Sequence, residues 1–216
     1  MSVDFSQKWV AEAVSELLDK PVSEISAGDM AKIKYMAFGA SFQNDFFIEI
    51  SLEQPPKPFV NSDGGDEWAF CLRGEDISKL VEEYKGKNNV HISMYGLDRE
   101  DEEWNDIVYS EEAEKAWESF KKSVKTSNYY ESFEDDESCE KWDKWYDGVE
   151  GSAHKDIELF TGLEVLRVQG LTNVPDLTFL DKLPQLRAIE LVETEFVSFV
   201  GIEKLERLEQ VSCWLD

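Results

Sequence analysis

Apolar residues near the C-terminus recur in a nine-residue pattern, with steps of three, three and two between them. The pattern occurs at residues 160–168, 183–191 and 205–213, so successive copies are offset by 23 and 22 residues. The step of two is the period of a β-strand, and the steps of three suit a short helical or 3₁₀ return segment. A single copy cannot bury its own apolar side, so we expect the copies to stack with their strands in a parallel sheet.

A fourth copy of the pattern lies much earlier, at residues 30–38. Residues 5–18 precede it and predict an amphipathic helix, because their apolar positions recur at three- and four-residue steps. Asp19-Lys20-Pro21 ends that helix. Ser26 and Asp29 have the spacing of a capping box, which predicts a second, short helix running towards Ile33. Residues 1–39 are therefore expected to form a helical cap and a first copy.

This N-terminal arrangement resembles the cap of bacterial, internalin-like leucine-rich-repeat proteins. In that family, a helix, a Lys-Pro and an Ile-Ser/Thr-x-x-Asp-hydrophobic segment precede the first repeat. Lys20-Pro21, Ile25-Ser26 and Asp29-Met30 stand in those places here. The resemblance covers residues 5–39 and 156–216 and implies a solenoid that binds other molecules. The chain departs from the family where Asn is usual, since Leu171 and Thr194 stand there in two copies.

Residues 40–155 lack the period of the copies and predict an irregular α+β region. Strands are expected at 46–52, 68–72 and 90–95, and helices at 77–84 and 110–125. Residues 129–147 are expected to form a helix or an ordered excursion. The helix and strand at 77–95 either stack in the same solenoid as a larger, irregular repeat, which is the interpretation we favour, or belong to a separate α+β insert. The fold class is thus α/β: a short, irregular leucine-rich-repeat solenoid with a parallel sheet, a helical N-terminal cap, an α+β middle region and regular repeats over 156–216.

Charge changes this picture more than any other property of the composition. The chain has 47 Asp and Glu against 22 Lys and Arg, a net charge of −25. Residues 98–150, an acidic and aromatic segment, hold 19 acidic and 7 basic residues. Such a field repels phosphate backbones and anionic lipids and attracts basic proteins. We therefore expect a basic protein partner, and neither a nucleic acid nor a membrane; solubility alone is the alternative explanation.

Cysteine usage and the N-terminal sequence favour a cytoplasmic protein. Cys71, Cys139 and Cys213 are odd in number and far apart, so they match neither a disulfide framework nor the paired spacing of a zinc site. The first ten residues lack a basic segment followed by an apolar run, and no apolar stretch approaches the length of a membrane span.

The residues give little support to catalysis or metal binding. His91 and His154 have no nucleophile motif beside them. The acids between Asp98 and Asp106 lack the alternating order and the glycine of a calcium loop. We therefore expect no enzyme, no metal and no cofactor. A hydrolase-type enzyme that uses carboxylates or His91 of the middle region remains the alternative.

Two sets of residues are candidates for binding. The first set points outward from the strands of the copies, where a solenoid presents its concave surface: Val165, Arg167, Gln169, Ala188, Glu190, Val192, Gln210, Ser212 and Trp214. The second belongs to the acidic segment: Asp98, Glu102, Trp104, Asp135 and Asp136. Together they predict a non-catalytic protein-interaction module, and a toxin-neutralising, immunity-type protein would account for its small size and acidity. For the first set, a plain solvated sheet face is the alternative.

The last predicted strand stands immediately before the end of the chain. Without a capping segment, such a strand would expose its edge, and exposed edges promote association. We therefore expect a homodimer through the C-terminal end, and a structural role in self-assembly is a further alternative.

Overall fold

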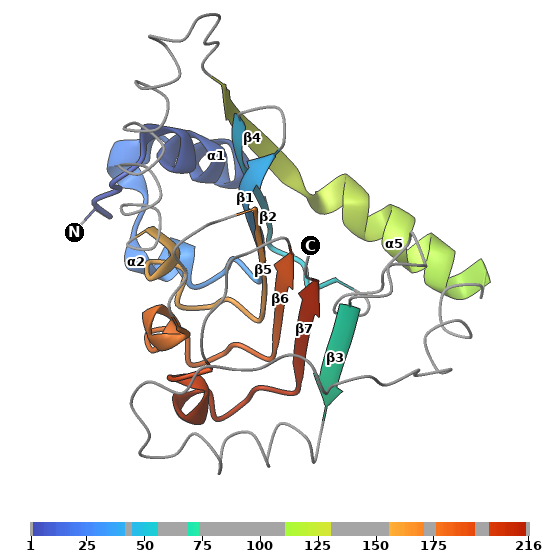
Figure 1. Ribbon diagram of the computed structural model, residues 1–216. Coiled ribbons are helices and arrows are strands. Elements are labelled where there is room, and N and C mark those ends of the chain that lie inside the picture. The colour runs from blue at the N-terminus through green and yellow to red at the C-terminus, as the bar shows by residue number, and fades with distance from the viewer. Residues whose placement is uncertain are drawn as a thin grey trace, which may run out of the picture.

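The computed structural model describes residues 2–41, 45–55, 69–73, 111–130, 156–170, 176–192 and 199–214. Its centre is a seven-stranded mixed sheet with the order β3-β7-β6-β5-β1-β2-β4 (Figure 1). The parallel strands are β1 (Tyr35–Ser41), β5 (Val165–Gln169), β6 (Ala188–Val192) and β7 (Gln210–Trp214). The strands β2 (Asp45–Ser51), β3 (Ala69–Arg73) and β4 (Lys125–Tyr130) pair antiparallel with their neighbours. The chain is thus α/β, as expected.

The four sequence copies supply the four parallel strands, and they stand in register. Met36 of β1 is opposite Leu166 of β5, which is opposite Ile189 of β6, and Ile189 is opposite Val211 of β7. These residues occupy the same place in each copy of the pattern. The predicted parallel sheet of the copies is therefore confirmed, including the distant first copy.

One backbone motif repeats between the copies just before each strand. The carbonyl of one copy accepts hydrogen bonds from two successive backbone N–H groups of the next, at 2.7 to 3.1 Å. Its three cases are Lys34 with Glu164 and Val165, Glu164 with Arg187 and Ala188, and Arg187 with Glu209 and Gln210. Because the first case matches the other two, the junction between β1 and β5 has the same geometry as the junctions within the C-terminal copies.

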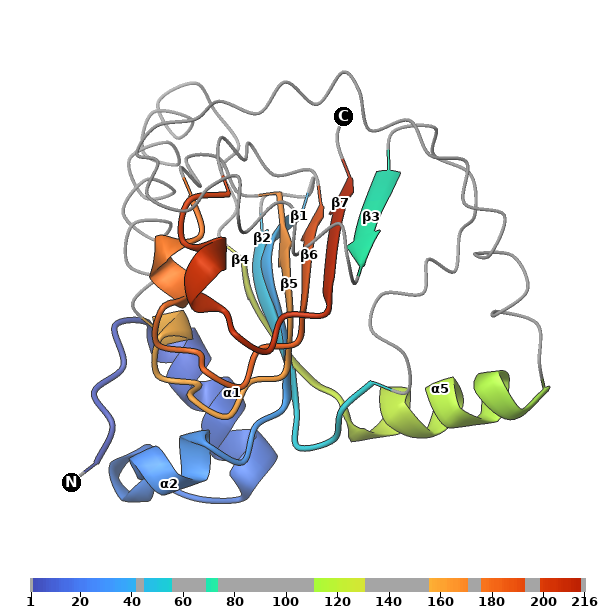
Figure 2. The same ribbon diagram turned by 90° about the horizontal axis from the view of Figure 1, so that it is seen from below.

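The core lies on one face of this sheet. The helices α1 (Lys8–Leu18) and α2 (Ala27–Met30) gather on that side, with the 3₁₀ helices η1 (Val22–Glu24), η3 (Thr178–Leu180) and η4 (Ile202–Lys204) (Figures 1 and 2). Trp9 of α1 stacks on Phe38 of β1, with ring centroids 5.4 Å apart. Leucines at the steps of three, such as Leu163, Leu183 and Leu186, are fully buried or nearly so. Burial of this apolar face drives the stacking, since apolar area removed from water contributes about 25 cal/mol per Å².

Most local predictions agree with the structure near their expected bounds. The capping box at Ser26 and Asp29 is present. The strands β2 and β3 and the helix α5 (Glu111–Ser123) cover the segments predicted at 46–52, 68–72 and 110–125. Helix α1 begins at Lys8 instead of residue 5, and β4 was not predicted as a strand. The helix expected at 77–84 and the strand expected at 90–95 lie outside the described residues.

The described strands of the middle region join the sheet at its edges. Strands β2 and β4 lie beyond β1, and β3 lies beyond β7. Strand β1 forms an antiparallel hairpin with β2 on one side and pairs directly with β5 on the other. The helix–strand unit at 77–95, which is the segment expected to stack as a larger repeat, lies outside the described residues, so that expectation stays a prediction.

The prediction that the last strand has an open edge is wrong. Strand β3 pairs with β7 along its length, from Ala69 opposite Trp214 to Arg73 opposite Gln210. The backbone groups that would template a second chain are therefore used within this chain. The homodimer through the C-terminal end stays a prediction, without the support of an open β7 edge.

Two glycines permit the first copy to approach the second. A Cβ atom at Gly39 would lie 2.0 Å from the carbonyl oxygen of Gln169, and one at Gly162 would lie 1.9 Å from that of Ala31. Both contacts join residues of the N-terminal cap to residues of the C-terminal copies. Since backbone atoms cannot move aside as a flexible side chain can, the stack requires glycine at both places.

We predict that Gly162→Ala lowers the free energy of unfolding by about 1–3 kcal/mol, because its Cβ overpacks the junction. Urea unfolding measures this change. The matched control is Gly28→Ala in α2, where the nearest atom, Ser26 Oγ, would be 3.8 Å from the added Cβ. Alanine there should change the free energy by less than about 1 kcal/mol. Equal effects of the two substitutions would contradict the close approach.

Candidate functional site

The outward-facing strand residues lie on the sheet face opposite the core. The register aligns them in rows across the sheet: Val165, Ala188 and Gln210 form one row, and Arg167, Glu190 and Ser212 form the next. Gln169, Val192 and Trp214 form the third row. The structure therefore brings together all nine residues of the first predicted set, although it places Val192, Ser212 and Trp214 by register alone.

Much of this face is buried, whereas both sequence interpretations, a binding surface and a plain solvated sheet face, expected it to be open. Val165 and Ala188 are fully buried, Glu190 and Gln210 are 5% and 6% exposed, and Arg167 and Gln169 are partly buried. Part of the cover comes from Tyr35, which packs on Val165 and Ala188. Phe120 of α5 then meets the Tyr35 ring edge-on, with centroids 5.1 Å apart. Helix α5 approaches from the side away from α1 (Figure 2), so the expected open face is covered where these rings pack.

A charged row crosses the centre of this face. Arg167 stands between Ala37 and Glu190 in the register, and its Nε lies 3.4 Å from Glu190 Oε2. The Glu190 side chain is 7% exposed and that of Arg167 39%, so this ion pair is shielded on the carboxylate side. A buried carboxylate needs such a partner, because removing the partner costs about 3–5 kcal/mol of stability.

Tyr35, the first residue of β1, is connected to the charged row through Glu49, which lies opposite Ala37 in the register. Its hydroxyl donates to Glu49 Oε2 at 3.4 Å. Burial, followed by the nearby Glu49 carboxylate, raises the pKa of Tyr35 above its ordinary value. The phenol therefore stays protonated at neutral pH and acts as a hydrogen-bond donor, not as a base.

The acidic candidates fall outside the described residues. This holds for Asp98, Glu102, Trp104, Asp135 and Asp136, and for both histidines, His91 and His154. Among the residues that are described, no group of three or more His, Cys, Asp or Glu side chains could hold a metal ion.

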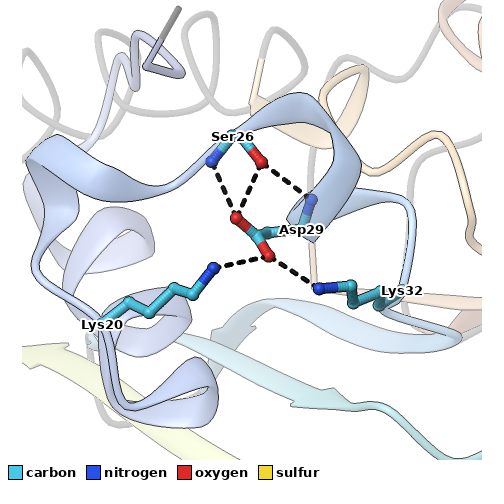
Figure 3. A network of polar contacts seen from close by, with 4 residues as sticks. All are labelled: Lys20, Ser26, Asp29 and Lys32. Carbon is cyan, nitrogen blue, oxygen red and sulfur yellow. Dashed lines mark hydrogen bonds and ion pairs between the residues drawn. The ribbon is translucent and has the colours of Figure 1, made fainter.

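A second polar network surrounds Asp29 in the N-terminal cap (Figure 3). One carboxylate oxygen accepts from Lys20 Nζ and Lys32 Nζ, both at 2.8 Å. The other accepts from the backbone N and the hydroxyl of Ser26, at 3.1 and 2.7 Å. The sequence predicted the Ser26–Asp29 pair but missed both lysines. Lysine pairing, first with Lys20 and then with Lys32, holds the pKa of Asp29 well below its ordinary value.

A third polar group, Asp156, gave no local signal in the sequence. Its carboxylate accepts the backbone N–H of Ser6 at 2.7 Å and that of Gln7 at 2.8 Å, and the residue is 1% exposed. Burial raises the pKa of Asp156, against the lowering effect of these two hydrogen bonds. The contact spans about 150 positions of the chain, so no motif search over neighbouring residues could find it.

Asp29 binds Lys20, Lys32 and Ser26, and Asp156 binds the backbone of Ser6 and Gln7, so both arrangements serve the structure. Among the described residues, the charged row also has partly exposed polar groups that a partner could contact, Arg167 and Glu49. No protein-family model matches the chain, and no curated protein or solved structure matches it either. Over the described part of the chain, none of the helices is both long enough and apolar enough to cross a membrane.

We predict that Asp29→Asn lowers the urea midpoint at about pH 7 and that its difference from the parent chain shrinks as the pH falls below about 4. The sign follows from the depressed pKa of Asp29: its stabilisation is present above the ordinary value of 3.8 and is lost as protons bind below it. Unfolding curves at about pH 7 and about pH 3 measure this trend. Glu24→Gln, which neutralises an exposed acid nearby, is the control. A pH-independent difference would show that the ion pairs of Asp29 do not stabilise the fold.

Proposed function

We propose that the chain is a non-catalytic protein-interaction module with a short leucine-rich-repeat solenoid, and that its acid excess selects a basic protein partner. The solenoid is the finer form of the α/β fold described above. What supports it is the repeated backbone motif, which joins the first copy to the second as it joins the later copies. In a solenoid, each copy contacts only its neighbours, and the stack serves as a scaffold for a binding surface.

Within the stack, basic side chains are matched with acidic ones of the adjacent copy. At the position before each strand the sign alternates along the stack, from Lys34 through Glu164 and Arg187 to Glu209. Lys34 Nζ lies 2.9 Å from Glu164, and Arg187 Nη2 lies 2.6 Å from Glu209. Two further pairs join adjacent copies at the return segments: Lys182 with Glu158, and Lys204 with Asp181. Most Lys and Arg side chains of the stack thus form ion pairs with Asp and Glu side chains of the stack itself.

The acid excess that could act on a partner lies mostly elsewhere. The described residues hold 22 acidic and 14 basic side chains, which leaves 25 acidic and 8 basic side chains in the rest of the chain. Residues 98–150 alone carry a net charge of −12. This uneven distribution is the observation that carries the proposal, because a concentrated charge of one sign speeds association with a partner of the opposite sign.

A small, acidic protein of this kind fits the neutralisation of a basic toxin, as an immunity-type protein in the cytoplasm would perform it. The partner's chemistry follows from the charge: a protein rich in Lys and Arg at the surface that meets the acidic segment. Affinity would then fall with added salt, since exposed charges are screened over about 10 Å at 0.1 M ionic strength.

The experiment compares the parent chain with a variant that neutralises four acids of the predicted set: Asp98→Asn, Glu102→Gln, Asp135→Asn and Asp136→Asn. Each immobilised protein is incubated with lysate of the source cell at about 50 mM and about 300 mM salt. The bound proteins are identified and their isoelectric points compared. We expect the parent chain to capture a specific basic protein at low salt. The variant should bind that protein about tenfold more weakly, a loss of about 1.4 kcal/mol of binding free energy.

The matched control neutralises four exposed acids of the described part: Asp4→Asn, Glu24→Gln, Glu53→Gln and Glu206→Gln. Both variants change the net charge from −25 to −21. Equal loss in both would assign the effect to net charge alone and overturn the role of the acidic segment. Capture that neither variant changes, or that high salt leaves intact, would overturn selection by charge.

A further inference from the structure

Helix α1 begins without a cap of its own. Gln7 stands at the N-cap with an extended backbone, but its side chain makes no capping hydrogen bond, and the first turn contains no acidic residue. The N-terminal amides of a helix need acceptors, and Ser, Thr, Asp or Asn at the N-cap usually supplies them. The sequence of α1 therefore supplies no side-chain acceptor at its N-cap.

Asp156, far along the chain, binds the backbone at the start of this helix: the N-cap residue Gln7 and Ser6 before it. Its two carboxylate oxygens take the N–H groups of Ser6 and Gln7, one each, at 2.7 and 2.8 Å. Hydrogen bonds of N–H groups to a carboxylate are among the stronger ones in proteins. These bonds fix the two residues that lead into α1, so the position of the helix start depends on a residue 149 positions later than Gln7.

The position of Asp156 depends in turn on the C-terminal copies. Ile157 follows it and is fully buried, as is Phe160, the first apolar residue of the second copy. The same core holds Trp9 and Val10 of α1. The carboxylate can therefore reach Ser6 and Gln7 only when residues 156–160 are seated against the N-terminal cap.

We propose that Asp156 is a clasp that makes the order of helix α1 conditional on docking of the C-terminal copies. With the clasp closed, the N-terminal cap and the second copy form one cooperative unit. When residues 156–160 leave the core, α1 loses the acceptors at its start together with the apolar surface on which it packs.

The test is hydrogen exchange of the full chain, followed by mass spectrometry of peptides. In Asp156→Ala, the peptide that contains residues 5–18 should exchange about 5- to 30-fold faster, as expected for the loss of one or two kcal/mol of local stability. The peptide that contains residues 183–191 should exchange within about twofold of the parent chain. Asp156→Asn keeps the shape and one acceptor, so it should give a smaller change and serves if the alanine variant does not fold. Asp181→Ala, which removes an exposed acid of the copies, should leave α1 unchanged.

A rescue separates capping from a general structural role. Gln7→Asp places a capping carboxylate at the N-cap itself, and in the Asp156→Ala background it should restore a large part of the protection of α1. Faster exchange throughout the chain that Gln7→Asp does not reverse would overturn the clasp, because Asp156 would then support the whole core. Unchanged exchange of α1 in Asp156→Ala would overturn it as well.

Discussion

The parallel pairing of β1 with β5 is the constraint on which the rest of the structure depends. It joins residues about 130 positions apart and sets Met36 opposite Leu166. Closing such a long loop is entropically unfavourable, although the cost grows only slowly with loop length. Burial of one continuous apolar face across four copies offsets that cost, since no copy can bury its face alone.

Several independent features make this junction specific. The carbonyl of Lys34 repeats the hydrogen bonding of the later copies, and the Lys34 side chain pairs with Glu164. Gly162 allows the backbone to approach Ala31, while Asp156 holds the start of α1. Each of these features stabilises the fold modestly, yet all of them act at the junction between the first copy and the second. A slipped register would lose them together, which explains how the first copy finds its neighbour across the intervening residues.

The fold was predictable from the sequence where the signal is local or periodic. The repeated steps of three, three and two gave the parallel strands, and Ser26 with Asp29 gave the capping box. Contacts between distant segments that share no repeated pattern were not predictable. Nothing near β3 indicates that it would pair with β7, and nothing near Asp156 indicates its bonds to Ser6 and Gln7. For the candidate site, the register of Arg167 and Glu190 followed from the copies, but the burial of the Glu190 side chain did not, because no local pattern shows what covers this face.

Disulfide trapping at the junction tests the central claim most directly. In a background with Cys71, Cys139 and Cys213 replaced by Ser, Lys34→Cys is combined with Glu164→Cys. Adjacent strands bring such positions within the span of a disulfide, about 4.4 to 6.8 Å between Cα atoms. The account predicts that this bond forms as readily as one between Arg187→Cys and Glu209→Cys, whose backbone geometry is equivalent. Formation no faster than between Lys34→Cys and Arg187→Cys, which lie two copies apart, would contradict it.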